Sequence, residues 1–88
     1  MELFSIHWKK SASKELRKLK PNLIKTILSK VENLSRNPYP QDSKKLVGSE
    51  KTFRIRVGYY RIIYEVESNR LIIQIVRIRH RKDAYKRL

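Results

Sequence analysis

Three short runs near the end of the chain alternate apolar with basic residues, and this pattern restricts the fold more than any other feature. The runs cover residues 52–57, 60–66 and 71–78 and are rich in Ile, Val, Tyr and Phe, which favour strands. Residues 58–59 separate the first two runs, and residues 67–70 separate the last two. Both spacings are typical of hairpin turns. We therefore expect a meander of three antiparallel strands.

Alternation also divides the residues of these runs between two faces, because successive side chains of a strand point to opposite sides. The apolar residues expected to enter the core are Phe53, Ile55 and Val57. Arg54 and Arg56 then share the other face, where an antiparallel meander can also bring Arg61 and Arg81. Guanidinium groups stay charged and bind phosphate through several donors. This face is a candidate phosphate-binding surface; the alternative is a solvated face that only adds solubility.

The first half of the chain predicts one more strand and two helices. Residues 3–8 alternate as a strand does. Ser11 suits the N-cap of a helix beginning at Ala12. Pro21 ends that helix and suits the first turn of a second one, whose apolar positions repeat at helical spacing as far as Leu34. The two helices are expected to form a hairpin.

The expected fold class is α+β, with the two-helix hairpin packed on one face of a four-stranded, mainly antiparallel sheet. Residues 82–88 are expected to form a short C-terminal helix or an extension. Because the helices intervene between the first strand and the meander, that strand should lie at or next to a sheet edge. The 88 residues, 1–88, are expected to form one domain.

Charge and composition limit the partners and the compartment. Twenty-two Lys and Arg residues against eight Asp and Glu residues give a net charge of +14, which opposes compaction unless a polyanion or an acidic protein neutralises it. The chain has no cysteine, so a disulfide framework is excluded and a reducing compartment is favoured. It has no secretory signal and no run of about 18 apolar residues that could span a membrane. A cytoplasmic protein that does not enter membranes is expected.

Several kinds of chemistry are poorly supported by the residues present. His7 and His80 are far apart and have no acidic cluster beside them, so no metal site or cofactor is expected. The two glycines, Gly48 and Gly58, cannot make a phosphate-binding glycine loop. Cleavage of RNA by its own 2′-OH needs only a base, an acid and fixed positive charge. That reaction is compatible with a set of arginines, a histidine and a tyrosine.

Two residues near the C-terminus could complete such a site. Histidine is the usual proton carrier near neutral pH, and His80 lies between Arg79 and Arg81; the alternative is a histidine that only ends a strand. Tyr85 could stack on an unpaired base, or pack on the sheet and hold the tail. The further residues expected to contact RNA or the ribosome, or to dock an acidic partner, are Lys9, Lys10, Lys14, Arg17, Lys18, Arg77, Arg79 and Lys82.

The order of these elements, together with four short strings, resembles the RelE branch of the RelE/ParE toxins. The strings are residues 45–48 (KLVG), 53–58 (FRIRVG), 60–66 (YRIIYEV) and 76–85 (VRIRHRKDAY). Each string is weak alone, and their order and spacing cover nearly the whole chain. The resemblance implies a toxin of a type II toxin-antitoxin pair that cuts mRNA in the ribosomal A site by 2′-OH attack, without a metal. It also implies a cognate acidic antitoxin as partner, in a hetero-oligomer.

Residue roles follow from the same resemblance. Arg54 and Arg56 are expected to serve the 2′-OH side and the phosphate, and Arg61 the transition-state charge. Arg81 is expected to serve the leaving group, and Tyr85 to stack on or orient the cut nucleotide. Members of the family differ at the position of His80, so the general acid stays open. The alternatives are a ParE-like gyrase inhibitor, which lacks the convergent basic set, and a non-catalytic RNA- or ribosome-binding module.

Overall fold

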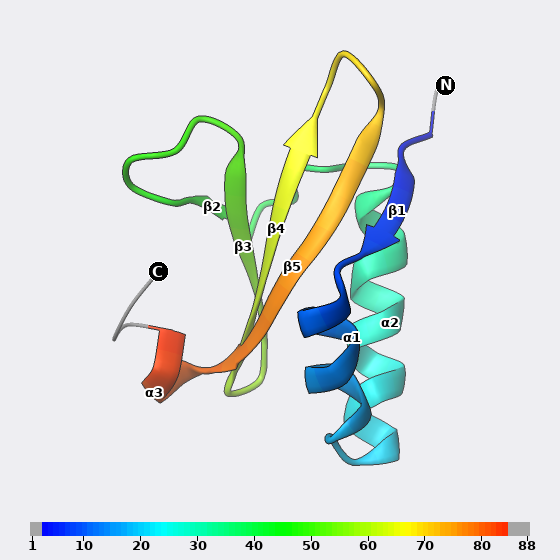
Figure 1. Cartoon of the computed structure of the whole chain (residues 1–88), viewed down its shortest axis with the longest axis vertical. Coiled ribbons are helices and arrows are strands. Elements are labelled where there is room, and N and C mark those ends of the chain that lie inside the picture. The colour runs from blue at the N-terminus through cyan, green and yellow to red at the C-terminus, as the bar shows by residue number, and fades with distance from the viewer. Residues whose placement is uncertain (1–2, 85–88) are drawn as a thin grey trace.

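The alternating runs form the strands of one sheet, and the two helical segments cover one side of it (Figure 1). The computed structural model describes the backbone of residues 3–84 and the side chains of residues 3–82. The elements, in chain order, are β1 (Ser5–Trp8), α1 (Lys10–Arg17), α2 (Pro21–Leu34), β2 (Lys44–Lys45), β3 (Thr52–Val57), β4 (Tyr60–Glu67), β5 (Ile72–His80) and α3 (Arg81–Ala84).

The sheet has the strand order β1-β5-β4-β3-β2. β1 pairs with β5 in parallel, and the other pairs are antiparallel. This confirms the α+β class and the edge position of the first strand. The expected count of four strands was wrong, because β2 is only two residues long and alternation cannot be recognised over so short a segment. The expected C-terminal helix is present in part, as α3.

The core lies between the sheet and the pair α1 and α2. Its fully buried members come from both layers, and they include Ala12, Ile27, Val31 and Leu34 of the helices and Ile55, Ile62, Tyr64, Ile73 and Ile75 of the strands. In β3, Ile55 and Val57 are buried, Phe53 packs against the core and Arg56 is exposed. The predicted division of this strand into an apolar and a basic face is confirmed.

The beginning of α1 differs from the prediction. α1 starts at Lys10 with Lys9 as its N-cap residue, so Ser11 does not cap it. The Ser11 hydroxyl instead donates a hydrogen bond of 3.0 Å to the carbonyl of Val76 in β5. That carbonyl lies on the edge of β5 beyond the end of β1, where none of the strands between residues 3 and 84 pairs with it. A long-range partner therefore decides the role of Ser11. Pro21 does stand at the start of α2.

Tyr64 fastens the segment between α2 and β2 to the sheet. Its side chain is fully buried, and its hydroxyl donates a 2.7 Å hydrogen bond to the Pro38 carbonyl. Burial raises the pKa of the Tyr64 phenol to about 12, because the charged form would lose its hydration. Within residues 3–84, no helix is long and apolar enough to cross a membrane.

Candidate functional site

Three arginines stand side by side across three strands. Arg56 of β3 lies opposite Arg61 of β4, and Arg61 lies opposite Arg79 of β5. Directly opposite side chains have Cβ atoms about 4.5–5.5 Å apart. By alternation from the buried residues of β3 and β4, this row lies on the sheet face that α1 and α2 leave uncovered.

A second row lies next to the first on the same face. Lys44 lies opposite Arg54, Arg54 opposite Ile63, and Ile63 opposite Arg77. Ile63 is only 3 % exposed, so the surrounding side chains shield it from water, as the long stems of arginine and lysine do. We call the set Lys44, Arg54, Arg56, Arg61, Arg77 and Arg79 the basic face.

A β-bulge decides that β5 contributes to the basic face. The register of β5 shifts so that Ile63 pairs with Arg77 while Tyr64 pairs with Ile75, which leaves Val76 as an extra residue. Without it, simple alternation would place Arg77 on the same face as the buried Ile75. Bulges commonly re-aim side chains in this way. The hydroxyl of Ser11 bonds the carbonyl of the extra residue.

Lys44 is a member of the basic face that sequence reasoning missed. It lies in the two-residue strand β2 and is exposed. The sequence signal that could have found it is the pair of lysines just before the alternating segment 52–57. A pair on an extended segment puts one lysine on each face.

The basic face works against folding in the absence of an anion. Like charges directly opposite each other on neighbouring strands destabilise a sheet, and the first row contains two such pairs, Arg56 with Arg61 and Arg61 with Arg79. Arg61 is also only 4 % exposed, and a buried charge needs partners. One of its terminal nitrogens donates a 3.3 Å hydrogen bond to the Tyr60 carbonyl. Fixed positive charge at such a cost is typical of an anion-binding surface.

The charge of this sheet face changes along the strands. Beyond the second row the same face carries Thr52, Glu65, Gln74 and His7, which lie opposite one another in the register. The positive charge is thus confined to the end of the sheet where β3 and β4 join. This distribution favours a localised anionic group over a uniformly charged ligand.

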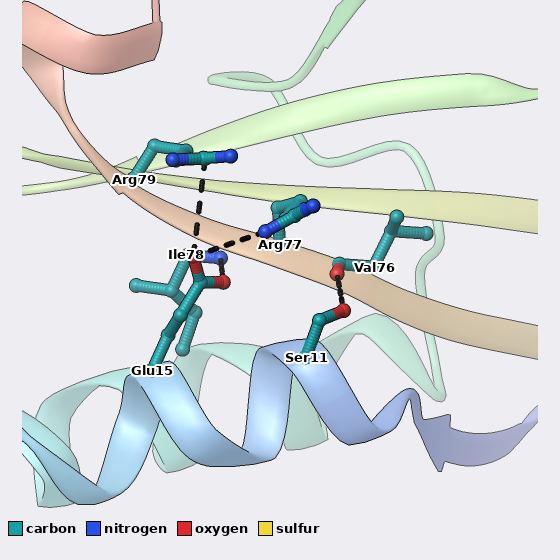
Figure 2. Close-up of polar contacts among 6 residues, drawn as sticks. All are labelled: Ser11, Glu15, Val76, Arg77, Ile78 and Arg79. Carbon is teal, nitrogen blue, oxygen red and sulfur yellow. Dashed lines mark hydrogen bonds and ion pairs between the residues drawn. The ribbon is translucent and has the colours of Figure 1, made fainter.

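Glu15 of α1 reaches the edge of the basic face. One carboxylate oxygen accepts a 2.9 Å hydrogen bond from the backbone N–H of Ile78. The other lies 3.5 Å from Nη1 of Arg77 and 3.8 Å from Nε of Arg79 (Figure 2). A carboxylate therefore stands beside two of the six basic side chains.

His80 and Arg81 form a separate group with the turn between β3 and β4. His80 lies opposite Tyr60, and their rings meet edge to face at 5.4 Å, while the Tyr59 ring stacks on His80 at 6.1 Å. The backbone N–H of Lys82 donates to Nδ1 of His80. The guanidinium carbon of Arg81 lies 5.3 Å from the centre of the Tyr59 ring.

This group does not share the row of arginines. His80 alternates with Arg79 along β5 and so lies on the helix-covered side. Arg81 is the first residue of α3 and has no place in the strand register. Arg81 directly follows the last strand, as expected. That it converges with Arg54, Arg56 and Arg61 stays a prediction, because the strand register ends at His80.

The other predicted residues are exposed or lie outside the described part of the chain. The exposed ones are Lys9, Lys10, Lys14, Arg17, Lys18 and Lys82. Tyr85 lies outside the described residues. Among the residues that the structure describes, no group of three or more His, Cys, Asp or Glu side chains could hold a metal ion.

The model of one protein family, the ParE toxin of the type II toxin-antitoxin system parDE, matches residues 6–85. The chain belongs to the RelE/ParE superfamily of toxins. This RelE/ParE toxin is 36% identical over 86 residues to the putative toxin RelE1 of Methanocaldococcus jannaschii, and the match covers 94% of this chain and 96% of that protein. The family implied by the sequence strings is confirmed.

Solved structures agree with this membership. The toxin superposes with a TM-score of 0.82 on a chain of the archaeal RelE-RelB complex from Pyrococcus horikoshii OT3, with 27% identity and coverage of 90% of this chain and 96% of that one. A chain of the toxin-antitoxin complex RelBE2 from Mycobacterium tuberculosis gives a TM-score of 0.79 at 27% identity, covering 91% and 93% of the two chains.

Proposed function

We propose that this RelE/ParE toxin is a ribosome-dependent endoribonuclease that cuts mRNA in the A site by attack of a ribose 2′-OH, without a metal. The observation that carries the proposal is the row of Arg56, Arg61 and Arg79 across three strands. Guanidinium groups in such a row can contact several oxygens of one phosphodiester at once.

The reaction assigns a role to each part of the basic face. The 2′-oxygen attacks the adjacent phosphorus, the bond to the 5′-oxygen breaks, and a 2′,3′-cyclic phosphate remains. Negative charge grows on the non-bridging oxygens, where preorganised donors lower the barrier most. Arg61 is central in the row and nearly buried, so it is the best-held of these donors. Arg54 and Arg56 serve the attacking side and the phosphate.

The proton transfers need other groups, because a guanidinium does not give up its proton near neutral pH. His80 is a candidate: its Nδ1 accepts the Lys82 N–H, which leaves Nε2 as the nitrogen for proton transfer. Arg81 serves the leaving group from the end of β5, and Tyr85 stacks on the cut nucleotide. The separation of His80 from the row means that the ribosome must place the mRNA around the end of the sheet. Free RNA is then a poor substrate.

The exposed basic residues of α1 and Lys82 hold ribosomal RNA through its phosphates in this proposal. The partner outside the ribosome is an acidic antitoxin. Two kinds of observation support it: the net charge of +14 and the relatives, which were solved as RelE-RelB and RelBE2 complexes. Toxin and antitoxin act in the cytoplasm, where mRNA is translated. A small acidic protein encoded beside the toxin should relieve its growth arrest.

A gyrase poison is the second candidate, because the matching family model describes ParE toxins. Inhibition of gyrase does not require a phosphate-binding arginine row. A module that binds the ribosome without cutting is the third. The basic face favours the nuclease over the gyrase poison, and the appearance of cut mRNA separates the nuclease from the binding module.

The test is mapping of mRNA 5′ ends in a translating extract given the full chain. Cuts within codons are expected with wild type and with Arg70→Ala, which removes an exposed arginine in the turn after β4. Arg61→Ala should lower the cleavage rate by about 100-fold to 1000-fold. Arrested translation without new 5′ ends, or loss of gyrase supercoiling activity at the same concentration, would overturn the proposal.

A further inference from the structure

Side chains of α1 form hydrogen bonds with the edge of β5 beyond the point where β1 ends. The register pairs Trp8 with Ile75 as the last residues of β1 and its partner segment, and β5 continues to His80. Beyond that point, Ser11 donates to the Val76 carbonyl and Glu15 accepts from the Ile78 N–H. Ser11 and Glu15 are four residues apart, so they project from one face of the helix.

Glu15 accepts a hydrogen bond from the edge of β5 and also contacts two arginines of the basic face. Its bond to the Ile78 N–H fixes one carboxylate oxygen, and the second oxygen then points between the guanidinium groups of Arg77 and Arg79 (Figure 2). The Glu15 side chain is 22% exposed, against 34% for Arg79 and 43% for Arg77. The Nε atom of Arg79 is buried and makes no hydrogen bond to any residue that the structure describes, so the carboxylate at 3.8 Å is the charge that stabilises it.

We infer that Glu15 is a positioning residue, which holds Arg79 in line with Arg61 and Arg56 before RNA arrives. This inference rests on the proposed nuclease function. The carboxylate offsets the repulsion between Arg79 and Arg61, which lie directly opposite each other. It engages Arg79 from the Nε side, and the terminal nitrogens, with four further N–H donors, stay available to a phosphate. Preorganisation of this kind raises the rate without adding contacts to the substrate.

A purely structural Glu15 would act only through the Ile78 hydrogen bond, and one substitution separates the two roles. Glu15→Gln keeps a side-chain oxygen for the Ile78 N–H and removes the charge beside Arg77 and Arg79. A matched control is Ser35→Ala, which removes another hydrogen bond from a side chain to the backbone, the 2.7 Å bond to the Phe4 carbonyl, far from the arginines in sequence.

The first measurement is steady-state cleavage of ribosome-bound mRNA by full-length wild type, Glu15→Gln and Ser35→Ala. Glu15→Gln is expected to lower kcat by about 10-fold to 100-fold with KM within about threefold, and Ser35→Ala to leave kcat unchanged even if its melting temperature falls. A kcat for Glu15→Gln within twofold of wild type overturns the inference. Equal losses in the two variants also overturn it, because they would follow from reduced stability alone.

The second measurement does not depend on catalysis. The Arg79 Nε–H is shielded from water and should give a persistent, shifted signal in ¹H-¹⁵N spectra of wild type, which Glu15→Gln should lose. If wild type does not cut mRNA and this signal behaves as expected, the proposed function fails while the contact to Glu15 stands. If wild type cuts mRNA and the signal is the same in both proteins, the positioning role fails alone.

Discussion

Arg56 of β3 and Arg61 of β4 lie directly opposite each other in an antiparallel pair. Two positive charges thus occupy a cross-strand pair, where opposite charges would stabilise the sheet and like charges destabilise it. This pair lowers the stability of the free toxin and at the same time concentrates positive charge at one point of the sheet. Stability and the concentration of positive charge are thus opposed at this position.

Replacement of Arg56 should therefore stabilise the fold. Arg56→Thr removes one like-charge pair and adds a strand-favouring residue, so we expect the free energy of unfolding to rise by about 0.2–1 kcal/mol. Urea unfolding measures this change, and Arg56→Lys, which keeps the charge, should show little gain. A loss of stability in Arg56→Thr would contradict the claim that repulsion between Arg56 and Arg61 destabilises the sheet.

Two adjacent lysines in β2 offer a matched pair for RNA binding. Lys44 lies opposite Arg54 and Lys45 opposite Phe53, and both are exposed. Lys44→Ala should reduce the slope of log affinity against log salt by about 0.7, the value for one phosphate contact on single-stranded RNA. Fluorescence anisotropy with an RNA oligonucleotide measures the slope. Lys45→Ala, on the other face, should leave it nearly unchanged; equal effects would contradict the assignment of Lys44 to the basic face.

Tyr64 should control stability through its hydroxyl. Tyr64→Phe leaves the Pro38 carbonyl without this partner, and we expect a loss of about 1–3 kcal/mol in the free energy of unfolding. Chemical denaturation near pH 8 measures it. A variant as stable as wild type would show that the segment between α2 and β2 is held by other contacts.

The same substitution should change the alkaline behaviour of the protein. The phenol has a pKa of about 12 in the folded state against an ordinary value of 10.0. The unfolded chain therefore loses this proton first, and the stabilising effect is complete below pH 10 and lost as the pH rises towards 12. The stability difference between wild type and Tyr64→Phe should narrow by about 1.4 kcal/mol per pH unit in that window. A constant difference from pH 9 to pH 12 would contradict the raised pKa.

The turn between β3 and β4 depends on Gly58. Its φ is +58°, and a Cβ there would meet no atom within 4 Å, so the expected effect of Gly58→Ala is backbone strain alone, about 1–2 kcal/mol. Thermal melting should show a fall of several degrees, since 1 kcal/mol corresponds to about 4–8 °C in a domain of this size. Gly58→Asn should lose less, because asparagine tolerates this conformation. Equal melting temperatures for the two variants would point to a contact that the structure does not contain.

The positions of Arg54, Arg56 and Arg61 on one face could be read from the sequence, because alternation in a strand is a local property and β3 and β4 pair without interruption. The two-helix hairpin and the meander could also be predicted from the sequence, because their periodicity is local. The bulge at Val76 could not be read, since it depends on pairing with a distant strand. It turns Arg77 and Arg79 towards the basic face and away from the core.

The sequence by itself determined the four longer strands, the two-helix hairpin, the apolar face of β3 and a large excess of positive charge, because periodicity and composition act over a few neighbouring residues. Only the tertiary structure decided the sheet register that aligns Arg56, Arg61 and Arg79, the recruitment of Lys44 through β2, the contact of Glu15 with β5 and the place of His80 on the other side. These depend on which segments meet across long stretches of chain. Burial of the apolar side chains in the common core sets the register of these segments, because a slip of one residue would exchange the two faces of a strand.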